Sequence, residues 1–156
     1  MKAALAVVGV FAALCAGCGG AKTIRTTVVT ETNVVTVTAP APEPAPHDYA
    51  RFQMPSKNIG CGYDSGVLRC DILSGLKPEP SEACELDWTG VVLEANGAAQ
   101  PECAGDTIYD GSAPILGYGE RWASNGISCE SRKDGLRCGN GSGHGFSLAR
   151  AAWDVT

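Results

Sequence analysis

Hydrophobic and polar positions in residues 48–156 alternate over short runs, and no long segment shows helical periodicity. Turn-forming pairs separate these runs at regular intervals: Ser65-Gly66, Asn96-Gly97, Asp110-Gly111, Asn125-Gly126 and Asp134-Gly135. Short strands between regularly spaced turns are typical of an all-β domain. The exception is "SLARAAW" at 147–153, whose composition predicts a short helical turn near the C-terminus.

One unit of this pattern occurs twice, at 56–70 and at 124–138. Each copy contains two cysteines with an isoleucine two positions before the first and a leucine two positions before the second, and each copy ends in Leu-Arg-Cys. Because residues two positions apart share one face of a strand, each copy is expected to form a hairpin. The turns would lie at 64–66 and at 133–135, where a glycine in the third place suits a type I turn with a bulge.

Six cysteines lie in residues 48–156: Cys61, Cys70, Cys84, Cys103, Cys129 and Cys138. An even number of cysteines in an exported chain indicates disulfides. Sequence alone leaves many pairings open, but the spacing favours Cys61–Cys70 and Cys129–Cys138, each across its hairpin. Cys84 and Cys103 then remain, around a third hairpin that turns at 96–97. The expected fold is a small all-β sandwich or barrel of three disulfide-stapled hairpins.

Metal binding is the alternative role for these cysteines. The chain has no Cys-x-x-Cys pair, and it has only two histidines, His47 and His144. Structural zinc ligands normally occur in close pairs. No metal site and no cofactor is therefore predicted.

The first 18 residues are typical of an export signal. Lys2 supplies the positive charge, and the apolar stretch 3–16 is too short to span a bilayer comfortably. The following "LCAGC" resembles the bacterial lipobox, which implies cleavage before Cys18 and acylation of that cysteine, with palmitate as one of the usual acyl groups. We therefore expect a lipid anchor on the outer face of the cell membrane. A cleaved signal peptide that leaves a secreted protein is the alternative.

Residues 19–47 differ in composition from the residues that follow. Their first half is rich in Thr and Val, and their second half alternates Ala and Pro. Proline fixes φ and removes the amide donor, so the second half is expected to be extended. We expect a flexible stalk between the anchor and a domain at 48–156; a docked edge strand formed by the Thr/Val half is the alternative.

The charge of the chain excludes one class of partner. The sequence has 12 Lys and Arg against 17 Asp and Glu, a net charge of −5, and no basic run. Nucleic-acid binding depends on clustered basic residues that neutralise phosphates. Nucleic acid is therefore not expected as a partner.

An ordered series of motifs carries a family resemblance: "FQMPSKNIGC", "VLRCDI", "CELDW", "CAGDT", "LGYGERW" and "CGNGSGHGFSLAR". It resembles a family of exported actinobacterial domains of unknown function, of the mycobacterial type, over nearly all of residues 51–150. The resemblance implies a secreted or lipid-anchored disulfide domain of the cell envelope. It implies no reaction and supplies no catalytic residue.

The most unusual stretch is "GNGSGHGFS" at 139–147, in which glycines isolate His144. A histidine exposed among glycines could bind a ligand or exchange protons near neutral pH; the alternative is a structural hydrogen bond in a tight bend. Ser142 and Asp106 could surround His144 in a nucleophilic arrangement, but no spacing requires it. No catalytic residue is therefore assigned.

A second candidate binding surface is the segment "GYGERW". Tyr118 and Arg121 could form a shelf for a glycan, with Trp122 in the core. Together these features predict a lipid-anchored envelope module that binds a protein partner or a cell-wall glycan and is not an enzyme. A small extracytoplasmic hydrolase that uses His144 is the alternative.

Overall fold

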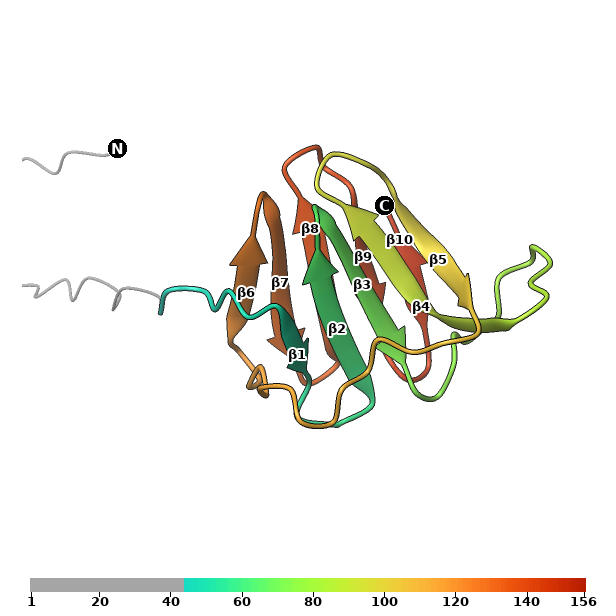
Figure 1. Ribbon diagram of the computed structural model, residues 1–156, viewed down its shortest axis with the longest axis horizontal. Coiled ribbons are helices and arrows are strands. Elements are labelled where there is room, and N and C mark those ends of the chain that lie inside the picture. Colours follow the sequence, from blue (N-terminus) through green and yellow to red (C-terminus); the bar gives the residue numbers. More distant parts are fainter. Residues whose placement is uncertain (1–43) are drawn as a thin grey trace, which may run out of the picture. The chain divides into compact units, whose positions relative to one another are not determined.

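The computed structural model describes residues 44–156, which form ten strands and no helix. The strands are β1 (Arg51–Gln53), β2 (Ile59–Asp64), β3 (Val67–Ile72), β4 (Asp87–Glu94), β5 (Ala99–Ala104), β6 (Arg121–Ser124), β7 (Ile127–Arg132), β8 (Gly135–Asn140), β9 (Gly145–Leu148) and β10 (Trp153–Val155). They form two antiparallel sheets of five strands, β1–β5 and β6–β10, each in sequence order (Figure 1). The all-β prediction is confirmed.

The N-terminal features of the sequence lie outside this part of the chain. The export signal, Cys18 and the stalk up to residue 43 are not among the described residues. Within residues 44–156, no helix is long and apolar enough to cross a membrane.

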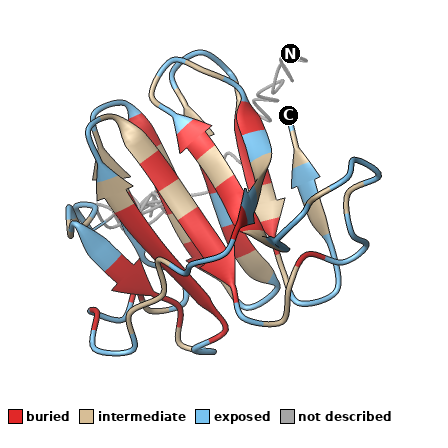
Figure 2. Ribbon diagram, turned by 45° about the vertical axis from the view of Figure 1, so that its right-hand side comes forward, coloured by how far each residue is buried: buried red, intermediate tan, exposed pale blue. Residues whose placement is uncertain are grey.

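The two sheets pack face to face around one hydrophobic core, so the fold is a sandwich. Buried and less buried positions alternate along β7, as a two-residue period requires, whereas residues 59–62 of β2 are all buried (Figure 2 colours each residue by burial). Phe52 on β1 and Trp122 on β6 contact one another across the sheets, with ring centroids 5.4 Å apart. Trp122 is completely buried, as predicted.

The two sheets have equivalent registers across all five strands. Directly opposed residues in the first sheet are Phe52, Cys61, Cys70, Val91 and Pro101. The corresponding row in the second sheet is Trp122, Cys129, Cys138, Phe146 and Val155. The repeated hairpin is thus the central part of a repeated five-stranded sheet.

All three disulfides follow the favoured pairing. Cys61–Cys70 and Cys129–Cys138 each join directly opposed residues of a hairpin, and Cys84–Cys103 joins the loop before β4 to β5. The third predicted hairpin is β4–β5, which turns at 95–98. Three hairpins were too few, because the short strands β1, β6, β9 and β10 complete the sheets.

The predicted helical turn at 147–153 is wrong. Ser147 and Leu148 belong to β9, Trp153 begins β10, and Ala149 N–H donates to the Ala152 carbonyl at 2.9 Å to close a hairpin. Leu148 is buried and pairs with Trp153, while Ser147 points to the other face. Core packing at a period of two outweighs the helix propensity of the Ala and Arg residues.

Each sheet is bridged at its first strand by the segment that precedes the other sheet. His47 forms a parallel bridge with Trp122 on β6, and Ile115 forms one with Gln53 on β1. His47 lies at the end of the predicted stalk, but its amide donates to the Arg121 carbonyl and its carbonyl accepts from the Ala123 amide. The ordered β structure therefore begins before residue 48. These bridges satisfy backbone groups on edges that would otherwise be open.

Candidate functional site

The connection from β5 to β6, residues 105–120, crosses the outer face of the first sheet and is called the crossover here (Figure 1). Ile108 and Tyr109 lie over two glycines of β2. A Cβ built on Gly62 would come within 2.6 Å of Ile108 Cγ1, and one on Gly60 within 2.6 Å of Tyr109 Cδ2. Both glycines are therefore required by the close approach of the crossover.

Asp71 on β3 anchors the start of the crossover. Its side chain is buried, with the residue only 1% exposed, and its two oxygens accept four hydrogen bonds. Arg69 donates two, Nε to Oδ1 at 2.9 Å and Nη2 to Oδ2 at 3.1 Å. Thr107 Oγ1 and the Ile108 amide donate to Oδ2 at 3.0 and 2.8 Å. Both oxygens of this buried carboxylate thus accept hydrogen bonds from the fold, one bond at Oδ1 and three at Oδ2.

Arg69 joins Asp71 to a second carboxylate on the crossover. Its guanidinium donates to Asp106 Oδ1 at 3.0 Å and to the Asp106 carbonyl at 2.8 Å. Burial lowers the pKa of Arg69, but the hydrogen bonds and charges of Asp71 and Asp106 outweigh it and raise that pKa above its ordinary value. Asp106 is therefore a structural partner of Arg69.

Gln53 anchors the later part of the crossover. Its buried amide Nε2 donates to the carbonyls of Gly111 and Ala113 at 2.9 and 2.8 Å, and its Oε1 accepts from the Tyr109 hydroxyl at 3.1 Å. With Asp71 at one end and Gln53 at the other, the crossover is fixed on the first sheet.

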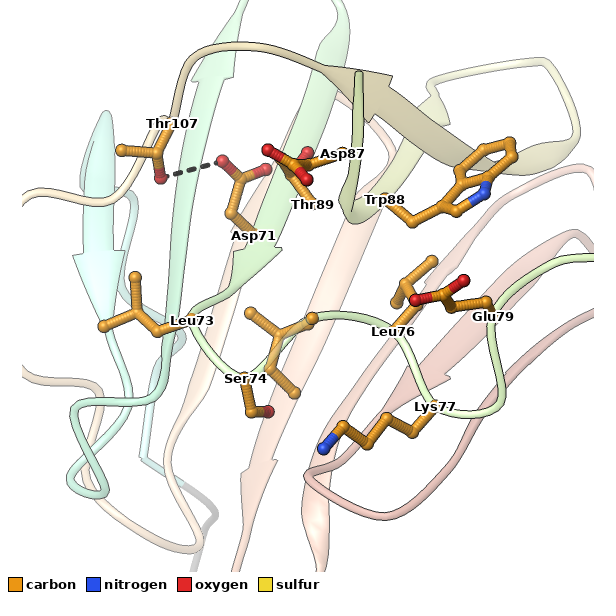
Figure 3. Close-up of a pocket in the computed structure, with 12 residues that line it drawn as sticks. Asp71, Leu73, Ser74, Leu76, Lys77, Glu79, Asp87, Trp88, Thr89 and Thr107 are labelled. Atoms are coloured by element: carbon orange, nitrogen blue, oxygen red, sulfur yellow. Dashed lines mark hydrogen bonds between the residues drawn. The ribbon is translucent and has the colours of Figure 1, made fainter. Parts of the chain in front are cut away.

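A cavity of about 450 Å³ lies beside the Asp71 anchor and is called the β3–β4 cavity here. It lies between the β3–β4 loop, the start of β4 and the crossover (Figure 3). The lining residues are Asp71, Ile72, Leu73, Ser74, Gly75, Leu76, Lys77, Glu79, Asp87, Trp88, Thr89 and Thr107.

The lining of the β3–β4 cavity combines polar groups of both charges with an apolar wall. Asp87 and Glu79 present carboxylates, and Lys77 presents an ammonium group from the loop (Figure 3). Leu76 is buried, and Trp88 packs against the core beside it. Because Asp71 is buried and bound by Arg69, Thr107 and Ile108, the charged groups most open to a ligand are those of the loop and of the start of β4. Such a lining can hold a molecule with several polar groups on an apolar skeleton.

No metal centre is formed by the described residues. No group of three or more His, Cys, Asp or Glu side chains in residues 44–156 is arranged to hold an ion. All six cysteines of this region are in disulfides. The β3–β4 cavity itself is lined by no histidine or cysteine among these residues.

The structure places His144 and Ser142 together in the β8–β9 loop. Asn140 Oδ1 accepts from the backbone amides of both, each at 3.0 Å, and so shapes the loop. Asn140 Nδ2 also donates to the carbonyls of Glu94 and Gly97, at the last residue of β4 and in the loop that follows it.

Asp106, the third residue considered with His144, lies at the other end of β4. It follows Ala104, which pairs with Asp87, the first residue of that strand. Because β4 runs eight residues from Asp87 to Glu94, a strand length separates Asp106 from the β8–β9 loop. The arrangement of Ser142, His144 and Asp106 around one point is not formed.

Tyr118 and Arg121 do not line one shelf. Tyr118 lines a cavity of about 290 Å³ together with Met54 and Arg132. Arg121 lines two other depressions, one beside His47 and one over β7 and β8. The predicted glycan shelf is therefore replaced by separate surfaces.

Sequence reasoning missed the residues of the crossover anchors and most of the cavity lining. Arg69 and Asp71 are two positions apart on one strand, and this alternation of opposite charges on one face was a usable signal. The 14 residues between β3 and β4 were another, because long irregular connections often carry sites. No comparable local pattern marks Gln53.

The sequence of residues 68–154 matches the model of one protein family, described as a family of unknown function, DUF6636. The chain belongs to the DUF6636 family. The match begins in β3 and ends in β10, so it contains the second sheet except for Val155 and the last three strands of the first sheet except for Val67. No curated protein and no solved structure matches the chain. The family membership accords with the resemblance to a family of unknown function, and it assigns no activity.

Proposed function

We propose that this DUF6636 protein is a lipid-anchored binding module of the cell envelope, held by Cys18 on the outer face of the membrane. Three disulfides indicate an extracytoplasmic location, because such bonds form and persist in oxidising compartments. The "LCAGC" segment supports the anchor. The function is to bind a cell-wall glycan in the β3–β4 cavity without chemical change.

The observation that carries the glycan proposal is the composition of the cavity wall. Sugars present hydroxyl groups around the ring edge and an apolar ring face. Asp87, Glu79 and Lys77 supply hydrogen-bond acceptors and donors, and Trp88 and Leu76 supply apolar surface. A volume of about 450 Å³ lies within the usual range for small-ligand sites.

The same lining supports binding rather than reaction. Asp87, Glu79 and Lys77 can hold and orient a ligand, but nucleophilic catalysis needs a nucleophile beside a base that is itself oriented by a third group. The lining hydroxyl of Thr107 does donate to Asp71, but that carboxylate also accepts from Arg69 and from the Ile108 amide and serves as the anchor of the crossover.

The test is glycan binding by the full chain with its disulfides formed. Calorimetry with purified wall glycan strands is expected to show binding that weakens at least about tenfold in Asp87→Asn/Lys77→Ala, since each hydrogen bond to a charged group contributes about 1.5–3 kcal/mol. Both side chains lie in exposed residues, so the double variant should fold. The matched control is Asp154→Asn/Lys133→Ala, which makes the same changes on exposed residues away from the cavity. Equal affinity in both double variants, or no binding by the native protein, would refute glycan binding in this cavity.

The anchor is tested separately in cells. The native protein is expected in the membrane fraction with an acylated Cys18, and Cys18→Ala is expected to lose both the acyl group and the membrane association. A native protein that carries no acyl group by mass spectrometry would refute the anchor and leave the glycan proposal unaffected.

A further inference from the structure

The equivalent registers of the two sheets place two arginines at matching positions on their outer faces. In the first sheet, one row of opposed residues is Arg51, Gly62 and Arg69. In the second sheet, the corresponding row is Arg121, Glu130 and Arg137. Each outer face therefore carries one arginine on its first strand and one on its third.

On the first sheet these arginines hold an extended segment of the chain. Arg51 Nη1 donates to the Ile108 carbonyl at 3.0 Å, and Arg69 binds the side chain and the carbonyl of Asp106. Asp71 accepts from the Thr107 hydroxyl and the Ile108 amide. Two guanidinium groups and one carboxylate thus bind a segment that reads Asp-Thr-Ile.

On the second sheet the corresponding face is open. A depression of about 360 Å³ lies over β7 and β8, lined by Gly119, Arg121, Ser128, Cys129, Glu130, Arg137, Cys138 and Gly139. Its floor contains the small residues Ser128 and Gly139. In the first sheet the positions of these two residues are taken by Gly60 and Asp71. This surface is called the open face here, and no segment of residues 44–156 fills it.

The open face has the same set of charged groups as the covered face, arranged differently. Arg121 and Arg137 correspond to Arg51 and Arg69, while the carboxylate is supplied by Glu130 from the middle of the row. Glu130 forms an exposed ion pair with Arg132 at 3.7 Å, and Arg137 forms an exposed one with Asp134 at 3.1 Å. Exposed pairs contribute little, so they are easily exchanged for a ligand.

We propose that the open face binds an extended segment of a partner protein in which an Asp or Glu precedes a hydroxyl or apolar residue. The acidic side chain of the segment pairs with Arg137, whose guanidinium also donates to a carbonyl of the segment, as Arg69 does in the first sheet. Glu130 accepts from an amide or hydroxyl of the segment, as Asp71 does in the first sheet. The floor formed by Ser128 and Gly139 leaves room for an apolar side chain, whereas Glu130 lies at the position of Gly62 in the first sheet.

This binding surface is independent of the proposed glycan site. The open face belongs to the second sheet, whereas the β3–β4 cavity belongs to the first, and they share no lining residue. Loss of one activity therefore leaves the other measurable in the same protein.

The test uses a synthetic peptide with the sequence of residues 105–113 as the probe and the ¹⁵N-labelled full chain as the target. Amide shifts are expected at Ser128 and Gly139, with affinity reduced at least about tenfold in Arg137→Gln, because a charge-assisted hydrogen bond contributes about 1.5–3 kcal/mol. Arg150→Gln, an exposed arginine outside the open face, is the matched control and should bind as the native protein does. A peptide with Asp106 replaced by Asn should lose affinity similarly.

Four outcomes would overturn the proposal. The first is no binding at millimolar peptide. The second is a shift pattern on the first sheet around Gly60 and Gly62, which would show exchange with the crossover. The third is equal weakening by Arg137→Gln and Arg150→Gln, which would show unspecific charge attraction. The fourth is self-association of the free protein through Ser128 and Gly139, which would make a second copy the occupant.

Discussion

Removal of the Asp71 side chain is the sharpest perturbation of the crossover anchor. Asp71→Ala would leave the Thr107 hydroxyl and the Ile108 amide without their acceptor, and it would remove two hydrogen bonds from Arg69. The crossover would then be held by Gln53 and by the hydrogen bonds that Arg51 and Arg69 donate to Ile108 and Asp106. We expect a large loss of stability without a change of fold, because the disulfides and the ladder of the first sheet do not depend on Asp71.

The magnitude follows from the burial of the pair. Removing one partner of a buried ion pair costs about 3–5 kcal/mol, because the other charge stays buried without compensation. Arg69 has a side chain 17% exposed and keeps Asp106 at 3.0 Å, so its charge remains partly paired. The expected loss for Asp71→Ala is therefore at the lower end, about 3 kcal/mol.

The assay is equilibrium unfolding in urea with the disulfides intact, and the control is Asp106→Ala. Asp106 binds the same guanidinium, but its side chain is 80% exposed, so its removal should cost about 1 kcal/mol or less. If Asp71→Ala costs no more than Asp106→Ala, the crossover is not anchored by the buried carboxylate and the reasoning is refuted.

Three further predictions concern single positions. Ser131 has a completely buried hydroxyl without a hydrogen-bond partner among the described residues. Ser131→Ala should therefore raise the free energy of unfolding by about 1 kcal/mol in the same urea assay. A loss of stability would show that the hydroxyl is satisfied. A Cβ at Gly145 would overlap the Cys138 carbonyl oxygen, so Gly145→Ala should destabilise by about 1–3 kcal/mol, and an unchanged Tm in calorimetry would contradict this. Hydrogen bonds from the Ser112 hydroxyl and amide lower the pKa of Asp110. In an NMR titration, Ser112→Ala should bring that pKa back up. The stabilisation from this pair is present at neutral pH and should be lost as the pH falls through the lowered pKa.

The central hairpins could be predicted from the sequence because their determinants are local. The position of the first turn is as predicted, but its type differs: Ser65 and Gly66 both have positive φ, so a two-residue turn replaces the expected type I turn with a bulge over 64–66. Cys61 and Cys70 lie at equal distances from that turn, which places them opposite one another. Cys129 and Cys138 likewise lie at equal distances from the turn at 133–134, although there the positive φ belongs to Gly135 and not to the two turn residues. The disulfide pairing therefore followed from spacing.

The remaining strands could not be predicted because their determinants are distant. β1 and β10 have three residues each, too few for a periodic signal, and they form because neighbouring strands offer a ladder. The helical composition of 147–153 was misleading for the same reason: burial of Leu148 decides its conformation, and burial depends on the opposite sheet.

The site was hidden by sequence distance and by divergence between the two sheets. Asp71 meets Thr107 and Ile108 from 36 and 37 residues away, and no local pattern links them. The equivalence of the outer faces is obscured because Asp71 is matched by Gly139 and Gln53 by Ala123. Only the register shows that the arginines of both faces correspond.

The most direct test of glycan binding in the β3–β4 cavity is to follow the indole N–H signals of the three tryptophans while wall glycan strands are added to the full chain. Trp88 lines the cavity, whereas the Trp122 Nε1–H is bonded to the Tyr49 carbonyl inside the sandwich. The account predicts a saturable shift of the Trp88 signal with the Trp122 signal unchanged, and loss of that shift in Asp87→Asn/Lys77→Ala. An unchanged Trp88 signal at saturating glycan would contradict it.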